Sequence, residues 1–202
     1  MHTPIGTGFS LTNGSSIDSE KARTEVAKTY IDRAASGGIC LLGITEHNDV
    51  SWIDYIRNAA SGTSVVVFPG FEITANTGGD GVHLVCLFDP DRKTKDLDGI
   101  LSYFGLTPSK RFTGDKRPAI AEATFETIIE KVRTEGGISI AAHATSNNGL
   151  LKSSTLGGGI RIKCFTNPTL LALEIPGTRD QLSDFEKILL PTSLMIITET
   201  FR

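Results

Sequence analysis

The sequence has no run of about 18 apolar residues, which is the length that a membrane-spanning helix requires. It also lacks a positively charged segment followed by an apolar one near Met1, so no secretory signal peptide is expected. Neither sign of charge predominates, because 20 Lys and Arg against 23 Asp and Glu leave a net charge of only −3. No basic stripe of the kind that marks tight nucleic-acid binding is present. Hydrophobic residues make up 39% of the chain, which predicts a soluble protein with a packed core and no membrane partner.

Cysteine is rare. The three cysteines, Cys40, Cys86 and Cys164, lie in or beside apolar runs, and none belongs to a CxxC or similar ligand pair. An odd number of isolated cysteines predicts buried free thiols in a reducing compartment rather than a disulfide framework. We therefore expect a cytoplasmic protein.

Two common catalytic motifs are missing. There is no GxSxG nucleophile elbow, which weakens, but leaves open, a hydrolase that uses a Ser or Cys nucleophile with His143 as its base. The Gly-rich stretch "TLGGGIR" at residues 155–161 lacks the GK[ST] ending of a phosphate-binding P-loop. Any phosphate chemistry must therefore come from other groups.

The sequence is rich in short, nearly continuous apolar runs, which are typical of strands buried on both faces. These runs cover residues 39–44, 65–68, 82–88, 138–142, 170–175 and 194–197. Stretches with helical periodicity fall between them, at residues 20–35, 50–60, 125–135 and 179–190. The alternation predicts an α/β domain with a mainly parallel sheet, either open or closed into a barrel.

Two segments interrupt this alternation. Residues 89–121 carry charges, prolines and a short apolar patch, and we interpret them as an insertion over the rim of the domain. Residues 144–160 are rich in Ser, Asn and Gly and are expected to be irregular. Because no convincing linker divides the chain, residues 1–202 are predicted to form a single domain.

Histidine is nearly as rare as cysteine, and its placement is informative. The four histidines are His2, His47, His83 and His143. His47, Glu72 and His143 each follow a predicted strand, and the carboxyl ends of parallel strands meet on one face, where active sites are built. His83 instead begins the run "HLVCLF", which fits this arrangement poorly.

Imidazole and carboxylate groups are good ligands for zinc, manganese and iron. A carboxylate such as that of Glu72 has two oxygens and could bridge two ions, and two such ions can position a phosphoryl group for attack by water. The alternative for any single histidine is a hydrogen-bonded core or rim residue without a metal. Several histidines and a glutamate expected on one face favour a metal centre.

Five motifs resemble those of the PHP (polymerase and histidinol phosphatase) family, in the same order and over nearly the whole chain. "MHTP" resembles the second half of its opening "DLHxHT" motif, and "ITEHND" resembles its "TDHD" motif. "FPGFEIT", "VHLVCLF" and "ISIAAHAT" resemble its "PGxE", "HxLxxF" and "AHP" motifs. The style of the insertion and of "LLALEIPGTRDQLSDFEKILL" is most similar to PHP domains linked to SMC-type ATPases.

The resemblance implies a distorted seven-stranded (β/α) barrel of TIM-like type and metal-dependent phosphoesterase activity with two or three divalent ions. It implies metal ligands at His2, His47, Glu72, His83 and His143. Glu72, as the bridging carboxylate, and His143 would be the central catalytic residues. The substrate would be a phosphate ester, either a small molecule or a nucleic-acid end, hydrolysed by metal-activated water.

The chain departs from the family pattern at both ends. The first His of the opening motif and the closing Asp-x-His are absent, so the domain is expected to be clipped at both ends and its barrel incomplete. These departures support an alternative, in which the chain is a degenerate PHP module that binds little metal and acts in regulation or in contacts with a larger ATPase. Full phosphatase turnover would exclude it.

Three basic residues follow His143, and a carboxylate ends a later strand. Lys152, Arg161 and Lys163 could contact substrate phosphate, although exposed Lys and Arg in a solvated loop are the commoner case. Glu174 ends the strand "LLALE" and could orient a ligand histidine; a salt bridge at the rim is the alternative.

Overall fold

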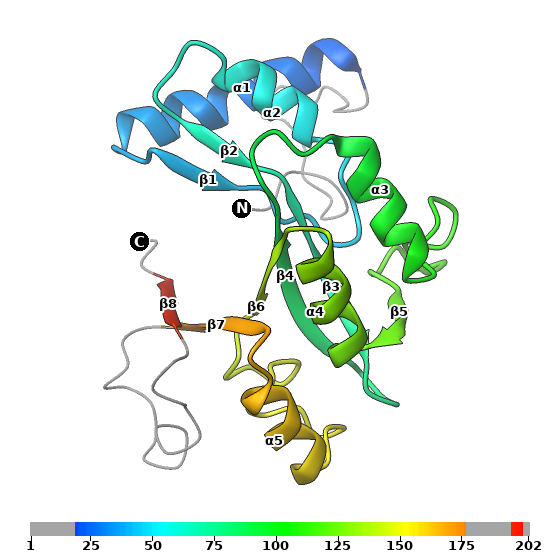
Figure 1. Cartoon of the computed structure of the whole chain (residues 1–202). Coiled ribbons are helices and arrows are strands. Elements are labelled where there is room, and N and C mark those ends of the chain that lie inside the picture. The colour runs from blue at the N-terminus through cyan, green and yellow to red at the C-terminus, as the bar shows by residue number, and fades with distance from the viewer. Residues whose placement is uncertain (1–18, 177–194, 200–202) are drawn as a thin grey trace.

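The computed structural model describes residues 19–176 and 195–199, which form two sheets flanked by helices (Figure 1). A two-stranded parallel sheet joins β1 (Leu41–Gly43) to β2 (Val66–Phe68). A six-stranded sheet has the order β5-β3-β4-β6-β7-β8. Its strands, in chain order, are β3 (Gly70–Asn76), β4 (Val82–Leu87), β5 (Ile120–Thr124), β6 (Ile138–Ala141), β7 (Leu170–Pro176) and β8 (Met195–Glu199).

The two sheets meet along the segment that runs through β2 and β3. Beyond β1, the chain continues beside this segment, since Ile44 N donates to Phe68 O and His47 forms an isolated parallel bridge with Glu72. Farther along β3, β5 takes over the same side, with Thr74 paired to Ile120. The loop that carries His47 therefore runs beside β3, between the end of β1 and the point where β5 pairs with β3.

The sheet is mixed. β4 runs antiparallel to both of its neighbours, β3 and β6, whereas the β3–β5, β6–β7 and β7–β8 pairs are parallel. The prediction of a mainly parallel sheet thus missed the direction of β4. No closed barrel forms among the described residues, so the α/β class is confirmed and the specific seven-stranded (β/α) barrel is not.

Close approach of two strands depends on one glycine. Gly70 begins β3, and a Cβ at this position would lie 2.2 Å from the carbonyl oxygen of Cys86 on β4. A larger residue would push the two strands apart, because that distance is far inside van der Waals contact. Gly70 therefore secures the pairing of β3 with β4, the two strands on which Glu72 and His83 lie.

The helices cover the sheets with the stripes that their periodicity predicts. α1 (Glu20–Ser36) and α2 (Ile53–Ala60) pack together beside β1 and β2, and α4 (Phe125–Thr134) lies against β6 (Figure 1). α4 buries Phe125, Ile128, Ile129 and Val132, and its N-cap Thr124 accepts a hydrogen bond from Thr127 N. The helix expected at 179–190 lies outside the described residues.

The insertion is more regular than its composition suggests. Residues 89–121 contain α3 (Thr94–Tyr103), which buries Leu97, Ile100 and Leu101, followed by a hairpin and the start of β5. The stretch expected to be irregular after His143 ends in α5 (Gly158–Thr166). No helix among the described residues is long and apolar enough to cross a membrane.

The cysteine prediction holds for two of three positions. All three thiols are free; Cys86 and Cys164 are buried, but Cys40 is exposed. Burial raises the pKa of the Cys86 thiol and raises that of Cys164 to about 12, so both stay protonated. Cys40 directly precedes β1 of the small two-stranded sheet.

Candidate metal centre

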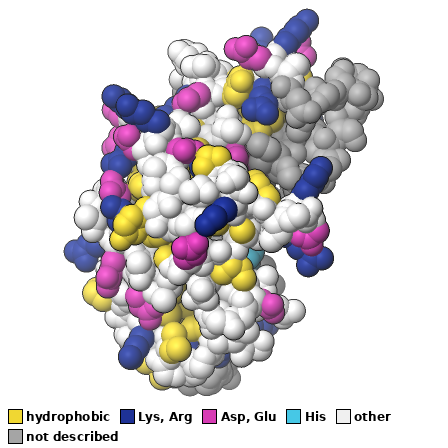
Figure 2. Space-filling view, turned by 90° about the vertical axis from the view of Figure 1, so that its right-hand side faces the viewer, with side chains coloured by type: hydrophobic (Ala, Val, Ile, Leu, Met, Phe, Trp, Pro, Cys, Tyr) yellow, Lys and Arg dark blue, Asp and Glu magenta, His cyan; other side chains and the backbone are white. Residues whose placement is uncertain are grey.

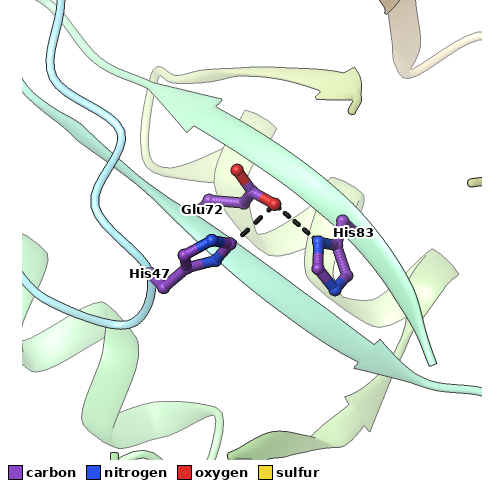
Figure 3. Close-up of side chains that lie close together, drawn as sticks. All are labelled: His47, Glu72 and His83. Atoms are coloured by element: carbon purple, nitrogen blue, oxygen red, sulfur yellow. Dashed lines mark hydrogen bonds and ion pairs between the residues drawn. The ribbon is translucent and has the colours of Figure 1, made fainter. Parts of the chain in front are cut away.

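Four side chains from four parts of the chain meet at one point of the sheet. Glu72 lies on β3, His83 on β4, His47 on the loop after β1, and His143 directly after β6. Figure 3 shows His47 and His83 on either side of the Glu72 carboxylate. The loop of His47 is fixed by two backbone hydrogen bonds, since Asn48 N donates to Glu72 O and Glu72 N donates to Glu46 O, each at 2.8 Å.

The direction of β4 explains the unexpected position of His83. In the antiparallel ladder Thr74 pairs with His83 and Glu72 pairs with Val85. Directly opposed residues share a face, so Glu72 and His83 are diagonal neighbours on one face of the sheet. A histidine at the start of β4 therefore reaches the same site as a glutamate in β3, which a parallel arrangement would not allow.

One oxygen atom is the centre of the cluster. Glu72 Oε1 lies 2.6 Å from His83 Nδ1, 3.4 Å from His143 Nε2 and 3.6 Å from His47 Nδ1. The Glu72 side chain is only 4% exposed, whereas those of His47 and His143 are 32% and 35% exposed. A buried carboxylate thus lies under imidazoles that are open to solvent on their outer side, as a site accessible to ions and substrate requires.

Three of the donor atoms lie close to the spacing of a metal site, with the Glu72–His83 edge shortened by a hydrogen bond. Glu72 Oε1, His83 Nδ1 and His143 Nε2 form a triangle with edges of 2.6, 3.1 and 3.4 Å. Tetrahedral zinc with ligand distances of about 2.0–2.1 Å separates its ligand atoms by about 3.3 Å. His47 joins from the other side, and ligand atoms of His47, Glu72 and His83 lie within 4.8 Å of one another. The donor set therefore fits a divalent ion, with Glu72 placed to serve two.

His143 is oriented by two further side chains. Its ring Nδ1 lies 2.6 Å from the Ser146 hydroxyl, which leaves Nε2 to face Glu72. Its backbone N–H donates to Glu174 Oε2 at 2.8 Å, and Ala144 N donates to Glu174 O at 2.7 Å. Glu174 thus contacts His143, a predicted ligand, through the backbone rather than through the ring.

Electrostatics follow from the carboxylate at the centre. The hydrogen bond and charge of Glu72 raise the pKa of the His143 imidazole, and burial lowers it only in part. Without a metal, a proton on the ring supplies the positive charge that Glu72 attracts. A metal ion would replace that proton, so the raised pKa marks a place where a cation is stabilised.

Backbone strain is concentrated at the site. Among described residues other than glycine, positive φ occurs only at Asn48, Lys116 and His143. His143 belongs to the cluster, Asn48 follows His47, and Lys116 lines the adjacent pocket. Such conformations cost stability for residues with a Cβ, and they persist mainly where function requires them.

A pocket of about 450 Å³ opens beside His47 and His83. Two cations from the insertion, Lys116 and Arg117, line it together with Asp80 and Asn148. The sequence analysis did not identify either cation as a candidate, because residues 89–121 were interpreted only as an insertion over the rim. Figure 2 views the side that carries α3 and β5, where charged side chains of both signs are interspersed.

The three cations predicted from the sequence lie elsewhere. None of Lys152, Arg161 and Lys163 lines the pocket beside the histidines, so their prediction as phosphate contacts gains no support. Arg161 Nη2 donates to the carbonyls of Ser153 and Leu156, at 2.6 and 3.2 Å, and so stabilises its own loop. Lys152 is exposed, and Lys163 lines a separate cavity. His2 lies outside the described residues.

Comparison with known proteins supports the fold and leaves the family open. No protein-family model and no curated protein matches the sequence. A solved structure from Bifidobacterium adolescentis, described as a metal-dependent phosphoesterase, matches with a TM-score of 0.61 at 15% identity. That match covers 85% of this chain and 80% of the other.

Two further structures are similar. An amidohydrolase from Chromobacterium violaceum, with bound sulfate and no metal, matches with a TM-score of 0.50 at 15% identity over 73% of this chain and 70% of the other. A two-domain protein from Bacteroides vulgatus that contains a PHP-like metal-dependent phosphoesterase matches with a TM-score of 0.47 at 13% identity, over 74% of this chain and 39% of the other. The chain therefore has the fold of the Bifidobacterium protein, which is described as a metal-dependent phosphoesterase.

Proposed function

We propose that the chain is a metal-dependent phosphoesterase of the PHP type. The observation that carries this proposal is the position of Glu72 Oε1, a buried carboxylate oxygen within 3.6 Å of three imidazole nitrogens. The fold shared with a protein described as a metal-dependent phosphoesterase supports the same reaction class. An incomplete PHP-like barrel belongs to the same proposal.

The ligands divide into two groups around Glu72. Glu72, His83 and His143 would hold one ion, and Glu72 with His47 would hold a second, to which the predicted ligand His2 would contribute. Imidazole and carboxylate suit zinc, manganese or iron. Bound divalent ions lower the pKa of a water ligand and neutralise charge on a phosphoryl group.

The chain's own residues supply position and electrostatics. Glu72 holds His83 and His143 in place through its Oε1, and Ser146 and Glu174 fix the orientation of His143. The pocket beside the cluster has the volume of a small-molecule site, which favours a small phosphate ester over a nucleic-acid end. The buried free thiols of Cys86 and Cys164 support a cytoplasmic location.

The competing function is a degenerate module that binds little metal. Hydrolysis of p-nitrophenyl phosphate by the full chain, with added manganese or zinc, separates the two. The proposal expects turnover that chelator removes and that Glu72→Gln abolishes, while Glu122→Gln, a change at an exposed carboxylate on β5, leaves it intact. A chain that takes up little metal and shows no turnover would favour the module, whose proposed role is then regulation or contact with an SMC-type ATPase.

A further inference from the structure

A short hairpin of the insertion, residues 111–119, forms one wall of the pocket beside the histidines; we call it the basic hairpin. Phe112 and Pro118 form an antiparallel bridge, Ala119 N donates to Arg111 O, and Thr113 N donates to Arg117 O. Lys116 N donates to Thr113 O, which closes the turn. The tip of the hairpin thus consists of residues 114–116, and the last of them has a left-handed backbone conformation. This arrangement is typical of a type I turn followed by a β-bulge.

The residue in that left-handed position is a lysine. Lys116 has a φ of 62°, in a turn position that usually carries glycine because a Cβ is disfavoured there. The chain therefore keeps a long cationic side chain where a glycine would be more stable. Because Lys116 lines the pocket, a binding role for its ammonium group accounts for this choice.

The base of the hairpin is tied to the loop of His47. Asn48 Nδ2 donates to Arg111 O at 3.0 Å and to Ala119 O at 2.8 Å, one on each arm of the hairpin. Asn48 is fully buried and directly follows His47. Arg111 is also buried and pairs with Asp98 of α3 at 2.5 Å. The position of the basic hairpin relative to His47 is thus fixed by buried hydrogen bonds and not by a flexible tether.

The pocket has an apolar part and a cationic part. Phe112, Pro118 and Ile120 supply apolar surface, and Lys116 and Arg117 supply charge. Asp115 Oδ2 lies 2.9 Å from Arg117 Nε, and Asp80 is the one carboxylate among the described residues that line the pocket. Because a metal-occupied cluster would itself be positive, the whole pocket favours a molecule that is negative at more than one place.

We propose that the basic hairpin is the substrate-recognition element, and that Lys116 and Arg117 bind an anionic group on the alcohol part of the phosphate ester. This rests on the proposed function, in which the histidine cluster takes the phosphate that is removed. The apolar wall contacts the body of the substrate between its two charged ends. Asn48 is a positioning residue, because it sets the distance between the histidine cluster and the cations of the basic hairpin.

Three non-hydrolysable probes test this proposal by calorimetry on the full chain in the presence of manganese. Phenylphosphonate carries one anionic group, 4-phosphonobenzoate adds a carboxylate, and 1,4-phenylenebisphosphonate adds a second phosphonate. At least one of the two doubly anionic probes is expected to bind roughly tenfold more tightly than phenylphosphonate, a factor typical of a charge-assisted contact. Which one binds better distinguishes a carboxylate from a phosphate as the recognised group. Equal affinity of all three, or no binding, would overturn the proposal.

Lys116→Gly and Arg117→Ala assign the effect to the hairpin. Lys116→Gly is expected to leave thermal stability unchanged or higher, because glycine suits the turn, and yet to remove most of the preference for doubly anionic probes. Lys110→Ala is the matched control, since Lys110 is an exposed lysine of the same insertion that does not line the pocket. A preference that persists in both hairpin variants would refute the role of these side chains.

Failure of this inference is distinguishable from failure of the proposed function. If manganese binds and p-nitrophenyl phosphate is hydrolysed, but the probes bind equally, only the role of the hairpin is wrong. If the chain takes up no metal, the proposed function is wrong. In that case, a preference of the metal-free chain for doubly anionic probes would still support the hairpin as an anion-binding element. If the metal-free chain shows no such preference, the anion-binding role of the hairpin is rejected as well.

Discussion

Glu72 Oε1 and His83 Nδ1 lie 2.6 Å apart across the antiparallel pair of β3 and β4. The contact exists because the two residues are diagonal neighbours on one face of the ladder, with Thr74 opposite His83. A buried carboxylate in such contact with imidazole orients the ring and favours a positive charge beside it. This relationship organises the cluster, and His47 and His143 join it through the same oxygen.

Asn48 is expected to support both stability and the geometry of the site. Asn48→Gly keeps the left-handed backbone, which has a φ of 52°, and removes only the two side-chain hydrogen bonds. Loss of the two hydrogen bonds should lower the free energy of unfolding by about 1–3 kcal/mol, measured by urea denaturation, since the Arg111 carbonyl keeps its hydrogen bond from Ala119 N. Asn48→Asp should cost more, because it places a carboxylate oxygen against both carbonyls. A Gly variant as stable as the native chain would show that the hairpin is held by other contacts.

Metal affinity should depend on pH through His143. Its folded-state pKa is raised by Glu72, so below the unfolded value of about 6.5 the charged pair is fully formed and stabilises the metal-free chain. That contribution is lost as pH rises through the folded pKa. Because a metal must displace this proton, manganese affinity should increase between about pH 6 and pH 8, as titrated by calorimetry. Affinity independent of pH over that range would contradict His143 as a ligand.

Glu174 should act on the metal through the position of His143. Glu174→Ala removes the acceptor of the His143 backbone N–H, and loss of such a supporting contact typically weakens metal binding about 10–100-fold. Glu174→Gln can still present an oxygen to the same N–H and should restore most of the affinity. If the Ala and Gln variants bind metal equally, the hydrogen bond has no role in positioning the ligand.

The two predicted metal positions should respond differently to loss of His2. The site of Glu72, His83 and His143 is complete within the described residues, whereas the site of His47 and Glu72 needs further ligands. His2→Ala should therefore remove one metal per chain and leave the other. Elemental analysis of the purified variant measures this, and an unchanged metal content would remove His2 from the ligand set.

The sequence predicts much of this site because ligand chemistry is local to a few residues. His47 and His143 each follow an apolar strand, and a strand that ends at a polar side chain can be recognised from the sequence alone. Glu72 follows β2 in the sequence but lies within β3 in the structure. The direction of β4 was not predictable in this way, because periodicity is the same for parallel and antiparallel strands. The position of His83 indicated the direction of β4. A ligand at the start of one strand can reach a site at the carboxyl ends of the other strands only if its own strand runs the opposite way.

Other features were missed for identifiable reasons. β3 was not predicted because "GFEITAN" mixes polar and apolar residues, although six of its seven positions are buried in the sheet. α3 was missed because Pro and charged residues surround its short apolar stripe. The pocket cations Lys116 and Arg117 went unnoticed within "TGDKRP", where only the Gly-Asp pair indicated a turn. Their position beside His47 depends on buried hydrogen bonds of Asn48, which connect residues 63 and 71 positions apart.

The central claim is that Glu72 and its histidines bind a catalytic metal. The most direct measurement is the metal content per folded chain, by elemental mass spectrometry after purification without chelator or a metal-binding tag. The account predicts at least one manganese, zinc or iron per native chain and loss of that metal in Glu72→Gln, with circular dichroism unchanged and Glu122→Gln behaving like the native chain. Substoichiometric metal in the native chain that added zinc or manganese does not increase would contradict the account.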